Sequence, residues 1–271
     1  MSVRILAPDA EPPSGAIFVD ARRRSSYERG HIPGAIHLAW EDWCEPAPPE
    51  AGAILAQPGY WGVLRDDAPI VCAERLAEAG VCSDRPLVVY SAGRRSRGRE
   101  GRIAWMLLYL GASDVCLLDG GLHAWQEQHG AEQATRSPEG GYFDISPRPE
   151  RRTTLTELSA AHAESRLPRL VDTRSQREFD GEIDEWLPRR GHIPSATLFP
   201  FTDLFDESDR YVGRDDHLER LPDALRGAGD TVAYCEVGVR ASLFAMIHEA
   251  HTGQVIPVFD GSLMQWSLDP V

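Results

Sequence analysis

Short apolar runs alternate with more polar, helix-like segments along the second half of the chain. The strand-like runs are residues 169–172, 196–200, 231–235 and 254–260. The helix-like segments are residues 175–180, 216–226 and 241–250. Strands that are apolar throughout are typical of a sheet covered on both faces, and alternation of strand and helix is typical of parallel pairing. The pattern therefore predicts an α/β fold, with a mainly parallel sheet flanked by helices.

The two halves of the chain carry the same motifs in the same order. The matching pairs are VDAR (19–22) with VDTR (171–174), RGHIPGA (29–35) with RGHIPSA (190–196), LVVYSAG (87–93) with TVAYCEV (231–237), and LLDGGLHAW (117–125) with VFDGSLMQW (258–266). Four pairs in one order indicate an internal duplication, so the α/β unit is expected twice.

The number of residues that separates the two members of a pair changes along the chain. These changes indicate an extra segment near residues 181–189 in the second half and a longer stretch near residues 45–63 in the first half. We expect two similar domains, at residues 1–134 and 153–271. Residues 135–152 are rich in proline, glycine and charge and are expected to form the linker.

Charge and composition argue against several classes of protein. The 271 residues include 42 acidic and 28 basic side chains, and the formal net charge of −14 opposes binding to nucleic acid or an anionic membrane surface. No apolar run approaches the ~20 residues of a membrane span, and the first residues lack a secretion signal. Five cysteines without paired or metal-binding spacing are typical of a reduced, cytoplasmic protein.

Cys235 directly follows a strand-like run and precedes a helix that is expected to begin between Val239 and Ala241. In a parallel α/β domain, functional groups gather at the carboxyl ends of the strands, where the N–H groups of the next helix stabilise negative charge. Such a setting favours the thiolate form of a cysteine. Gly238 lets the loop turn its amides inward, and Arg240 adds positive charge. The sequence therefore indicates a reactive cysteine.

The competing interpretation is that Cys235 is a small apolar core residue, as most lone cysteines of reduced proteins are. Cys116 fits that description, because it lies within a strand-like run. Cys44, Cys72 and Cys82 precede no comparable loop and are interpreted as structural. Cys235 differs from all four because it ends a strand and is followed by a glycine and a helix.

Together, the duplicated motifs resemble those of tandem-domain rhodaneses, sulfurtransferases of the thiosulfate or mercaptopyruvate type. The resemblance covers nearly the whole chain. It implies that Cys235 takes a sulfane sulfur from a small anionic donor, becomes a persulfide, and passes the sulfur to cyanide or to a thiol. The acceptor thiol can belong to a small molecule or to a protein. It implies no metal and no organic cofactor. The residues expected to bind substrate on this loop are Glu236, Val237, Gly238, Val239 and Arg240.

The loop departs from the family pattern at positions that bear on the donor. Glu236 and Val237 match neither enzyme type, and Glu178 stands where both types usually carry a substrate-binding arginine. Arg177, Arg189 and Arg190 are the candidates to supply the missing charge. The sequence therefore leaves thiosulfate and 3-mercaptopyruvate open as donors.

Ser91 stands at the cysteine position of the first domain, and a serine cannot carry a persulfide. The resemblance therefore implies that the first domain is catalytically silent and forms one side of the active site. Five arginines crowd the start of the helix that is expected next: Arg94, Arg95, Arg97, Arg99 and Arg102. They are interpreted either as a solvated basic face or as a local patch that binds an anion or a partner protein.

Several other residues are expected to be structural. They are His31 and His192 as hydrogen-bonding residues of the Gly-His-Ile-Pro turns, Asp20, Asp172 and Arg174 in domain-internal ion pairs, and Trp125 and Trp266 in the core.

Two other classes of function are alternatives to an enzyme that transfers sulfur. A rhodanese-like module that binds a protein and senses oxidation through its cysteine is motivated by Glu236 and by the altered substrate arginine. A phosphatase or arsenate reductase is disfavoured, because relatives with that chemistry have five residues between cysteine and arginine. Only four separate Cys235 from Arg240.

Overall fold

The computed structural model describes residues 3–51, 60–130, 140–183, 187–227 and 229–269. These residues form two five-stranded sheets, and every strand pair within them is parallel. The first sheet runs in the order β1 (Val3–Leu6), β5 (Val115–Leu118), β4 (Leu87–Tyr90), β2 (Ile17–Asp20), β3 (Ile36–His37). The second runs in the order β6 (Arg152–Thr153), β10 (Val258–Phe259), β9 (Thr231–Tyr234), β7 (Arg169–Asp172), β8 (Thr197–Leu198). The prediction of a duplicated α/β unit is confirmed.

Helices flank each sheet. In the first domain these are α1 (Arg24–Arg29), α2 (Pro69–Glu78), α3 (Arg99–Leu110) and α4 (Gly121–His129). In the second they are α5 (Leu155–Ala163), α6 (Gln176–Phe179), α7 (Arg214–Arg220), α8 (Val239–Thr252) and α9 (Ser262–Leu268). Short 3-10 turns add η1 (Trp40–Trp43), η2 (Pro49–Ala51), η3 (Gly93–Ser96), η4 (Pro149–Arg151), η5 (Phe201–Leu204) and η6 (Asp223–Leu225). No helix in these ranges is long and apolar enough to cross a membrane.

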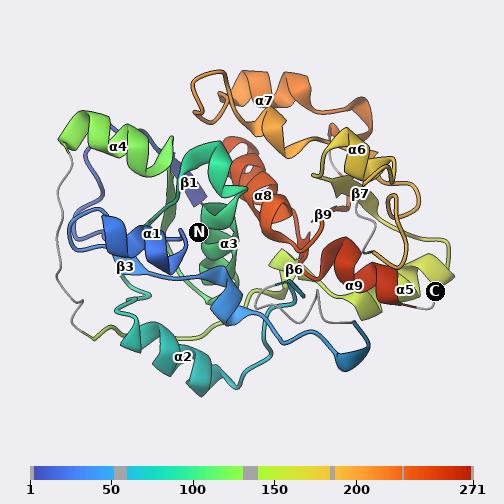
Figure 1. Ribbon diagram of the computed structural model, residues 1–271, viewed down its shortest axis with the longest axis horizontal. Helices are drawn as coiled ribbons and strands as arrows, with labels where there is room; N and C mark the ends of the chain where they lie inside the picture. Colours follow the sequence, from blue (N-terminus) through green and yellow to red (C-terminus); the bar gives the residue numbers. More distant parts are fainter. Residues whose placement is uncertain (1–2, 52–59, 131–139, 184–186, 228, 270–271) are drawn as a thin grey trace.

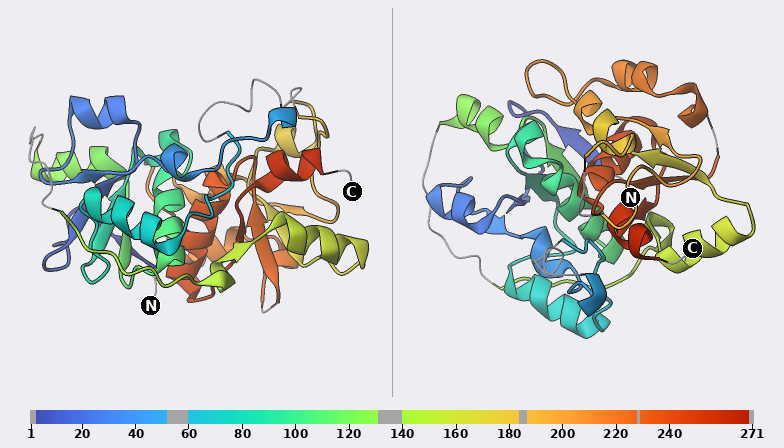
Figure 2. Two further views of the ribbon diagram at one scale, coloured as in Figure 1. Left: turned by 90° about the horizontal axis from the view of Figure 1, so that it is seen from below. Right: turned by 45° about the vertical axis from the view of Figure 1, so that its right-hand side comes forward.

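The two domains lie side by side, and α3 packs against α8 between the two sheets (Figures 1 and 2). The helices approach closely at Gly101, where an added Cβ would lie 2.3 Å from the Cα of Leu243. The Tyr211 hydroxyl of the second domain donates to Glu100 of α3 at 3.1 Å across the same boundary, where both side chains are buried. The interface therefore belongs to the core of the molecule, and it fixes the carboxyl ends of both sheets relative to each other.

The ion pairs expected inside each domain are present. Arg174 and Asp172 are both fully buried and pair at 2.7 Å, and Arg22 pairs with Asp20 at 2.5 Å. Each sheet also carries a buried tyrosine whose hydroxyl accepts a backbone N–H bond. Tyr90 accepts from Ile32 and Tyr234 from Ile193, both at 3.1 Å. The duplication thus preserves buried polar contacts as well as strand order.

Other expected structural residues also lie as predicted. Trp125 and Trp266 are 9% and 4% exposed. His31 and His192 bond through Nδ1 to the carbonyls of Tyr27 and Phe179, against whose rings they also stack.

Three expectations about element boundaries need correction. The helix expected over 216–226 ends at Arg220, because Pro222 lacks an N–H group and interrupts the helix before η6. The strand expected over 254–260 is confined to β10. Arg152, assigned to the linker, lies in β6, which pairs with β10 at the edge of the second sheet. Linker residues 135–139 and residues 52–59 of the longer first-half stretch lie outside the described residues.

Candidate active site

Cys235 lies directly after β9, and α8 begins at Val239, within the interval expected from the sequence. Three hydrogen bonds tie the cysteine loop to the start of α9. The Cys235 N–H donates to Ser262 Oγ at 3.1 Å, Leu263 N–H donates to the Cys235 carbonyl at 3.1 Å, and Met264 N–H donates to the Glu236 carbonyl at 3.0 Å. The loop is therefore held against the start of α9.

Gly238 is required by the geometry of this loop. Its φ is +78°, and an added Cβ would lie 2.4 Å from the Asp260 carbonyl oxygen. A second close approach comes from the first domain, where an added Cβ at Gly62 would lie 2.6 Å from the Val237 carbonyl oxygen. Both glycines let backbone pack directly against the loop. Gly62 lies in the stretch that makes the first half longer, so that stretch supports the cysteine loop of the other domain.

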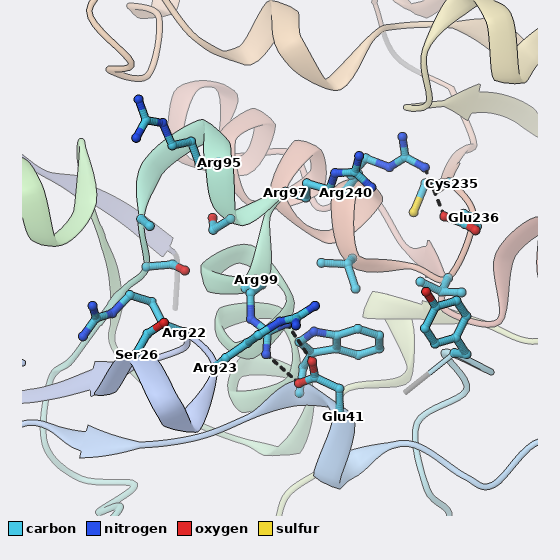
Figure 3. Close-up of a pocket in the computed structure, with 17 residues that line it drawn as sticks. Arg22, Arg23, Ser26, Glu41, Arg95, Arg97, Arg99, Cys235, Glu236 and Arg240 are labelled. Carbon is cyan, nitrogen blue, oxygen red and sulfur yellow. Dashed lines mark hydrogen bonds and ion pairs between the residues drawn. The ribbon is translucent and has the colours of Figure 1, made fainter. Parts of the chain in front are cut away.

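A cavity of about 860 Å³ opens between the two domains beside Cys235 (Figure 3). The second domain lines it with Cys235, Glu236, Val237, Val239 and Arg240. The first domain lines it with Arg22, Arg23, Ser26, Trp40, Glu41, Tyr60, Ser91, Ala92, Arg95, Ser96, Arg97 and Arg99. Cys235 is only 1% exposed, so this cavity is its access to solution. The structure thus gathers four of the five expected loop residues around the cysteine, with Gly238 shaping the loop.

Arg240 is paired with two carboxylates. It donates two hydrogen bonds to Glu178, at 2.9 and 2.7 Å, and Glu236 Oε2 lies 3.6 Å from its Nη2. Burial favours a raised pKa for Glu178, but the hydrogen bonds and charge of Arg240, together with a bond from Ser175, outweigh it and hold the pKa at about 2. At neutral pH, the Arg240 guanidinium of the cysteine loop is therefore paired with two carboxylates.

Arg240 keeps its charge for a related reason. Burial lowers the pKa of its guanidinium, whereas the hydrogen bonds that it donates to Glu178 and the negative charge of a Cys235 thiolate raise this pKa above the ordinary value. The thiolate of Cys235 and the guanidinium of Arg240 are thus close enough to interact electrostatically.

Arg177 and Arg190 are not brought to the cavity. Arg177 is exposed and pairs with Glu182 at 3.1 Å, and Arg190 is exposed at the end of the extra second-half segment. The helix geometry explains the first case: α6 turns Glu178 inward to cap the helix and bind Arg240, which leaves the neighbouring Arg177 on the outer face.

The arginines after Ser91 do not form a single solvated face. Arg94 pairs with Asp209 at 2.7 Å and Arg99 with Glu41 at 2.6 Å. Arg95 and Arg97 are exposed and line the cavity.

Arg102, the last arginine of this group, is only 1% exposed and donates to the Gly62 carbonyl at 2.5 Å, with its guanidinium 4.6 Å from the Trp105 ring centroid. The position of an added Cβ at Gly238 would be 2.8 Å from Arg102 Nη1, so this guanidinium lies beneath the cysteine loop. Sequence reasoning missed that contact. The signal available was its place on the apolar side of a helix, three residues before a tryptophan.

The other cysteines are placed as expected for structural residues. Cys116 is 1% exposed within β5, and Cys44 is buried near Arg102. Burial raises the pKa of the Cys44 thiol to about 11. Within the ranges that the structure describes, no group of His, Cys, Asp and Glu side chains is arranged to hold a metal ion.

Comparison with protein families identifies this architecture. The model of the rhodanese-like domain matches the chain twice, at residues 8–128 and 154–269. The chain therefore belongs to the rhodanese family and carries two copies of its domain.

Named relatives narrow the class. A probable 3-mercaptopyruvate sulfurtransferase of Pseudomonas aeruginosa is 33% identical over 251 residues, which cover 90% of this chain and 84% of the relative. A putative thiosulfate sulfurtransferase of Mycobacterium tuberculosis is 28% identical and covers 89% of this chain and 78% of the relative. The crystal structure of SseA from Escherichia coli, described as a 3-mercaptopyruvate sulfotransferase, shares the fold with a TM-score of 0.76 at 24% identity, covering 96% of this chain and 99% of that one. This chain is a sulfurtransferase enzyme.

Proposed function

We propose that the protein moves a sulfane sulfur from thiosulfate or 3-mercaptopyruvate to cyanide or a thiol, with Cys235 as the nucleophile. The observation that carries this proposal is the position of Cys235. It lies between the carboxyl end of β9 and the start of α8, at the wall of the interdomain cavity. A thiolate at that point faces helix N–H groups and the Arg240 guanidinium, both of which favour negative charge.

The first half-reaction with thiosulfate is a displacement at sulfur. The Cys235 thiolate attacks the outer, sulfane sulfur, a new S–S bond forms, and the bond to the sulfonate sulfur breaks. Sulfite leaves with that electron pair. With 3-mercaptopyruvate the bond that breaks is C–S, and the carbon fragment takes up a proton and leaves as pyruvate. In both cases the enzyme holds a Cys235 persulfide, whose outer sulfur carries the negative charge.

In the second half-reaction the acceptor attacks the outer sulfur of the persulfide. Cyanide leaves as thiocyanate, or a thiolate leaves as a new persulfide, and the S–S bond to Cys235 breaks so that its electron pair restores the thiolate. No external oxidant or reductant is consumed. The chemistry needs no metal or organic cofactor, because each step is a displacement at a divalent sulfur atom by a thiolate or by cyanide.

The loop from Glu236 to Arg240 is proposed to stabilise the anionic persulfide. Gly238, with φ of +78°, turns the chain so that successive amides face the same side, and α8 begins at the next residue. Preorganised N–H groups of this kind stabilise a charge that develops during a reaction. Arg177 and Arg190 do not enter the proposal, because they lie away from the cavity.

The charges around Arg240 affect which sulfur donor the enzyme prefers. Glu178 and Glu236 pair with the Arg240 guanidinium and so offset its attraction for an anion at Cys235. A donor with two negative charges is repelled about twice as strongly as one with a single charge. Thiosulfate is a dianion and 3-mercaptopyruvate a monoanion, so the pair Glu178–Arg240 is proposed to bias the enzyme against thiosulfate.

Steady-state kinetics test this function. With thiosulfate and cyanide as substrates, a shared persulfide intermediate predicts parallel double-reciprocal plots, because product leaves before the acceptor binds. Cys235→Ser should abolish thiocyanate formation, whereas Cys116→Ser, which alters a buried cysteine of the first sheet, should retain it. Turnover by Cys235→Ser at the wild-type rate with both donors would exclude Cys235 as the sulfur carrier.

A further inference from the structure

The guanidinium of Arg102 lies beneath the cysteine loop, where the two domains meet. Arg102 belongs to α3, the helix of the first domain that packs against α8. The residue is only 1% exposed, and its Nη1 lies 2.8 Å from the position of an added Cβ at Gly238. Gly238 follows Cys235 by three residues, and three peptide units span at most about 11 Å. The first domain therefore places a buried positive charge close to the reactive cysteine of the second.

Contacts on several sides hold this guanidinium in place. Its Nη2 donates to the Gly62 carbonyl at 2.5 Å, and its Cζ lies 4.6 Å from the centroid of the Trp105 ring. The ring is itself fixed, because Trp105 Nε1 donates to the Arg151 carbonyl at 2.8 Å. Gly62 in turn packs against the cysteine loop, where its added Cβ would lie 2.6 Å from the Val237 carbonyl oxygen. Arg102 is therefore a fixed charge and not a surface side chain that can swing into solvent.

No carboxylate matches the charge of Arg102. Within the described part of the chain, Arg102 forms no ion pair, and its Nη1 has no hydrogen-bond partner. Asp260, whose main chain packs against the same loop, directs its carboxylate to Arg152 at 3.0 Å and to the Leu64 N–H at 2.6 Å. A buried charge without a counter-charge is costly. An anion that forms on the loop is therefore stabilised by Arg102.

The other charged and titratable side chains around the loop are paired, exposed or neutral. Arg97 lines the cavity but is exposed, so solvent screens its charge. Cys44 Sγ lies 3.8 Å from Arg102 Nη2, and this thiol is neutral at pH 7 because burial raises its pKa to about 11. The paired groups are Arg240 with Glu178 and Glu236, Arg152 with Asp260, and Arg99 with Glu41.

We propose that Arg102 is a positioning residue for sulfur transfer, whose fixed guanidinium is the counter-charge for the anion that Cys235 carries. That anion is first the thiolate and then the persulfide. Arg240, the cation on the loop itself, is held by two carboxylates, so it offers less of its charge to the cysteine. The first domain, which carries Ser91 in place of a cysteine, thereby supports the chemistry of the second. The inference rests on the proposed function, because it adds a residue to that reaction.

The test follows the alkylation of Cys235 by iodoacetamide as a function of pH, read by mass spectrometry of the peptide that contains Cys235. Iodoacetamide is uncharged and reacts with the thiolate, so the midpoint of the profile is the pH at which half of Cys235 is ionised. Arg102→Met removes the charge and keeps an apolar chain beside Trp105. For a charge about 10 Å away, at an effective dielectric constant near 20, the midpoint should rise by about one unit. Below the midpoint, alkylation should slow about tenfold.

Two further variants separate charge from shape. Arg102→Lys keeps the charge on a side chain of similar length, and its midpoint should lie within about 0.3 units of the wild-type value. Arg75→Met is the matched control, because Arg75 also lies over a tryptophan ring, 4.2 Å from that of Trp43, but pairs with Asp67 at 3.1 Å. It should not move the midpoint. If Arg102→Met does not fold, Arg102→Gln removes the charge while keeping a donor, and the same rise is expected.

Three results would overturn the inference. Arg102→Met might slow alkylation equally at every pH with an unchanged midpoint, which is the behaviour of a residue that only supports the loop. Arg102→Lys and Arg102→Met could raise the midpoint equally, in which case the charge is not what matters. An equal rise in Arg75→Met would show that any arginine of the first domain has this effect.

Alkylation also separates this inference from the proposed function, because it needs neither a sulfur donor nor an acceptor. If the midpoint shifts as predicted but the wild-type protein gains no sulfur from thiosulfate or 3-mercaptopyruvate, the role of Arg102 stands and the proposed function fails. If the wild-type protein transfers sulfur and Arg102→Met leaves the midpoint unchanged, the proposed function stands and the role of Arg102 fails.

Discussion

Replacing Glu178 by glutamine tests the electrostatic account of the active site. Glu178 is 11% exposed at its side chain and holds Arg240 through two hydrogen bonds. The fall of its pKa from 4.5 to about 2 corresponds to about 3 kcal/mol in favour of the charged, paired state. Glutamine keeps the shape and can still cap α6 with its oxygen, but it removes the charge.

Glu178→Gln should therefore lower the free energy of unfolding by about 3 kcal/mol at pH 7, measured by urea titration. Because the folded pKa lies below the unfolded one, the stabilisation is fully present above pH 4.5 and is lost as the pH falls toward 2. The difference between wild type and variant should shrink to about 1 kcal/mol at pH 3. Glu182→Gln is the control, since Glu182 is exposed and pairs, among the residues that the structure describes, with the exposed Arg177; it should change stability by less than about 0.5 kcal/mol.

The same variant should change donor preference. Removing the negative charge that Glu178 holds against Arg240 relieves about 1 kcal/mol of repulsion for each unit charge on the donor, at an effective dielectric constant near 20 and with allowance for screening. This predicts a gain in kcat/KM of about fivefold for 3-mercaptopyruvate and about thirtyfold for thiosulfate. A variant that is as stable as wild type at pH 7, or whose thiosulfate rate falls relative to 3-mercaptopyruvate, would refute the reasoning.

Three further predictions follow from contacts around the loop and the core. Gly238→Ala should reduce sulfur transfer at least a hundredfold, because the Cβ would meet the Asp260 carbonyl at 2.4 Å; Gly213→Ala, whose Cβ meets nothing within 4 Å, should leave the rate unchanged in the same assay. Asp172→Asn should lower the free energy of unfolding by about 3 to 5 kcal/mol, since it strands the fully buried Arg174; a urea midpoint close to wild type would contradict this. Cys44, with its pKa raised to about 11, should resist iodoacetamide at pH 8 in the folded protein while partly exposed Cys82 reacts, which peptide mass spectrometry can read; equal labelling would count against the burial argument.

The motifs of the sequence predicted the fold because each is tied to a local requirement. Asp172 and Arg174, two residues apart, form an ion pair, and Gly238 supplies a positive φ that the loop needs. Such signals repeat in both halves, so the duplicated α/β unit and the position of Cys235 at the end of a strand could be inferred from the sequence.

The cavity could not be predicted in the same way, because its wall comes from two domains whose relative placement depends on tertiary packing. Arg102 is buried because α3 packs against α8. The strongly basic composition of its segment instead favours an exposed arginine. The positive charge of Arg177 makes it, and not Glu178, the residue expected to bind an anion. The capping box of α6 instead turns Glu178 inward, where it meets an arginine 62 residues away.

Intact-mass spectrometry of the purified protein tests the central claim most directly. After incubation with thiosulfate or, separately, with 3-mercaptopyruvate, the wild-type protein should gain about 32 Da, the mass of one sulfur atom, and lose it on addition of cyanide. Cys235→Ser should show no gain. A wild-type protein whose Cys235 is reduced and alkylatable, yet gains no sulfur from either donor, would contradict the assignment of Cys235 as the sulfur carrier.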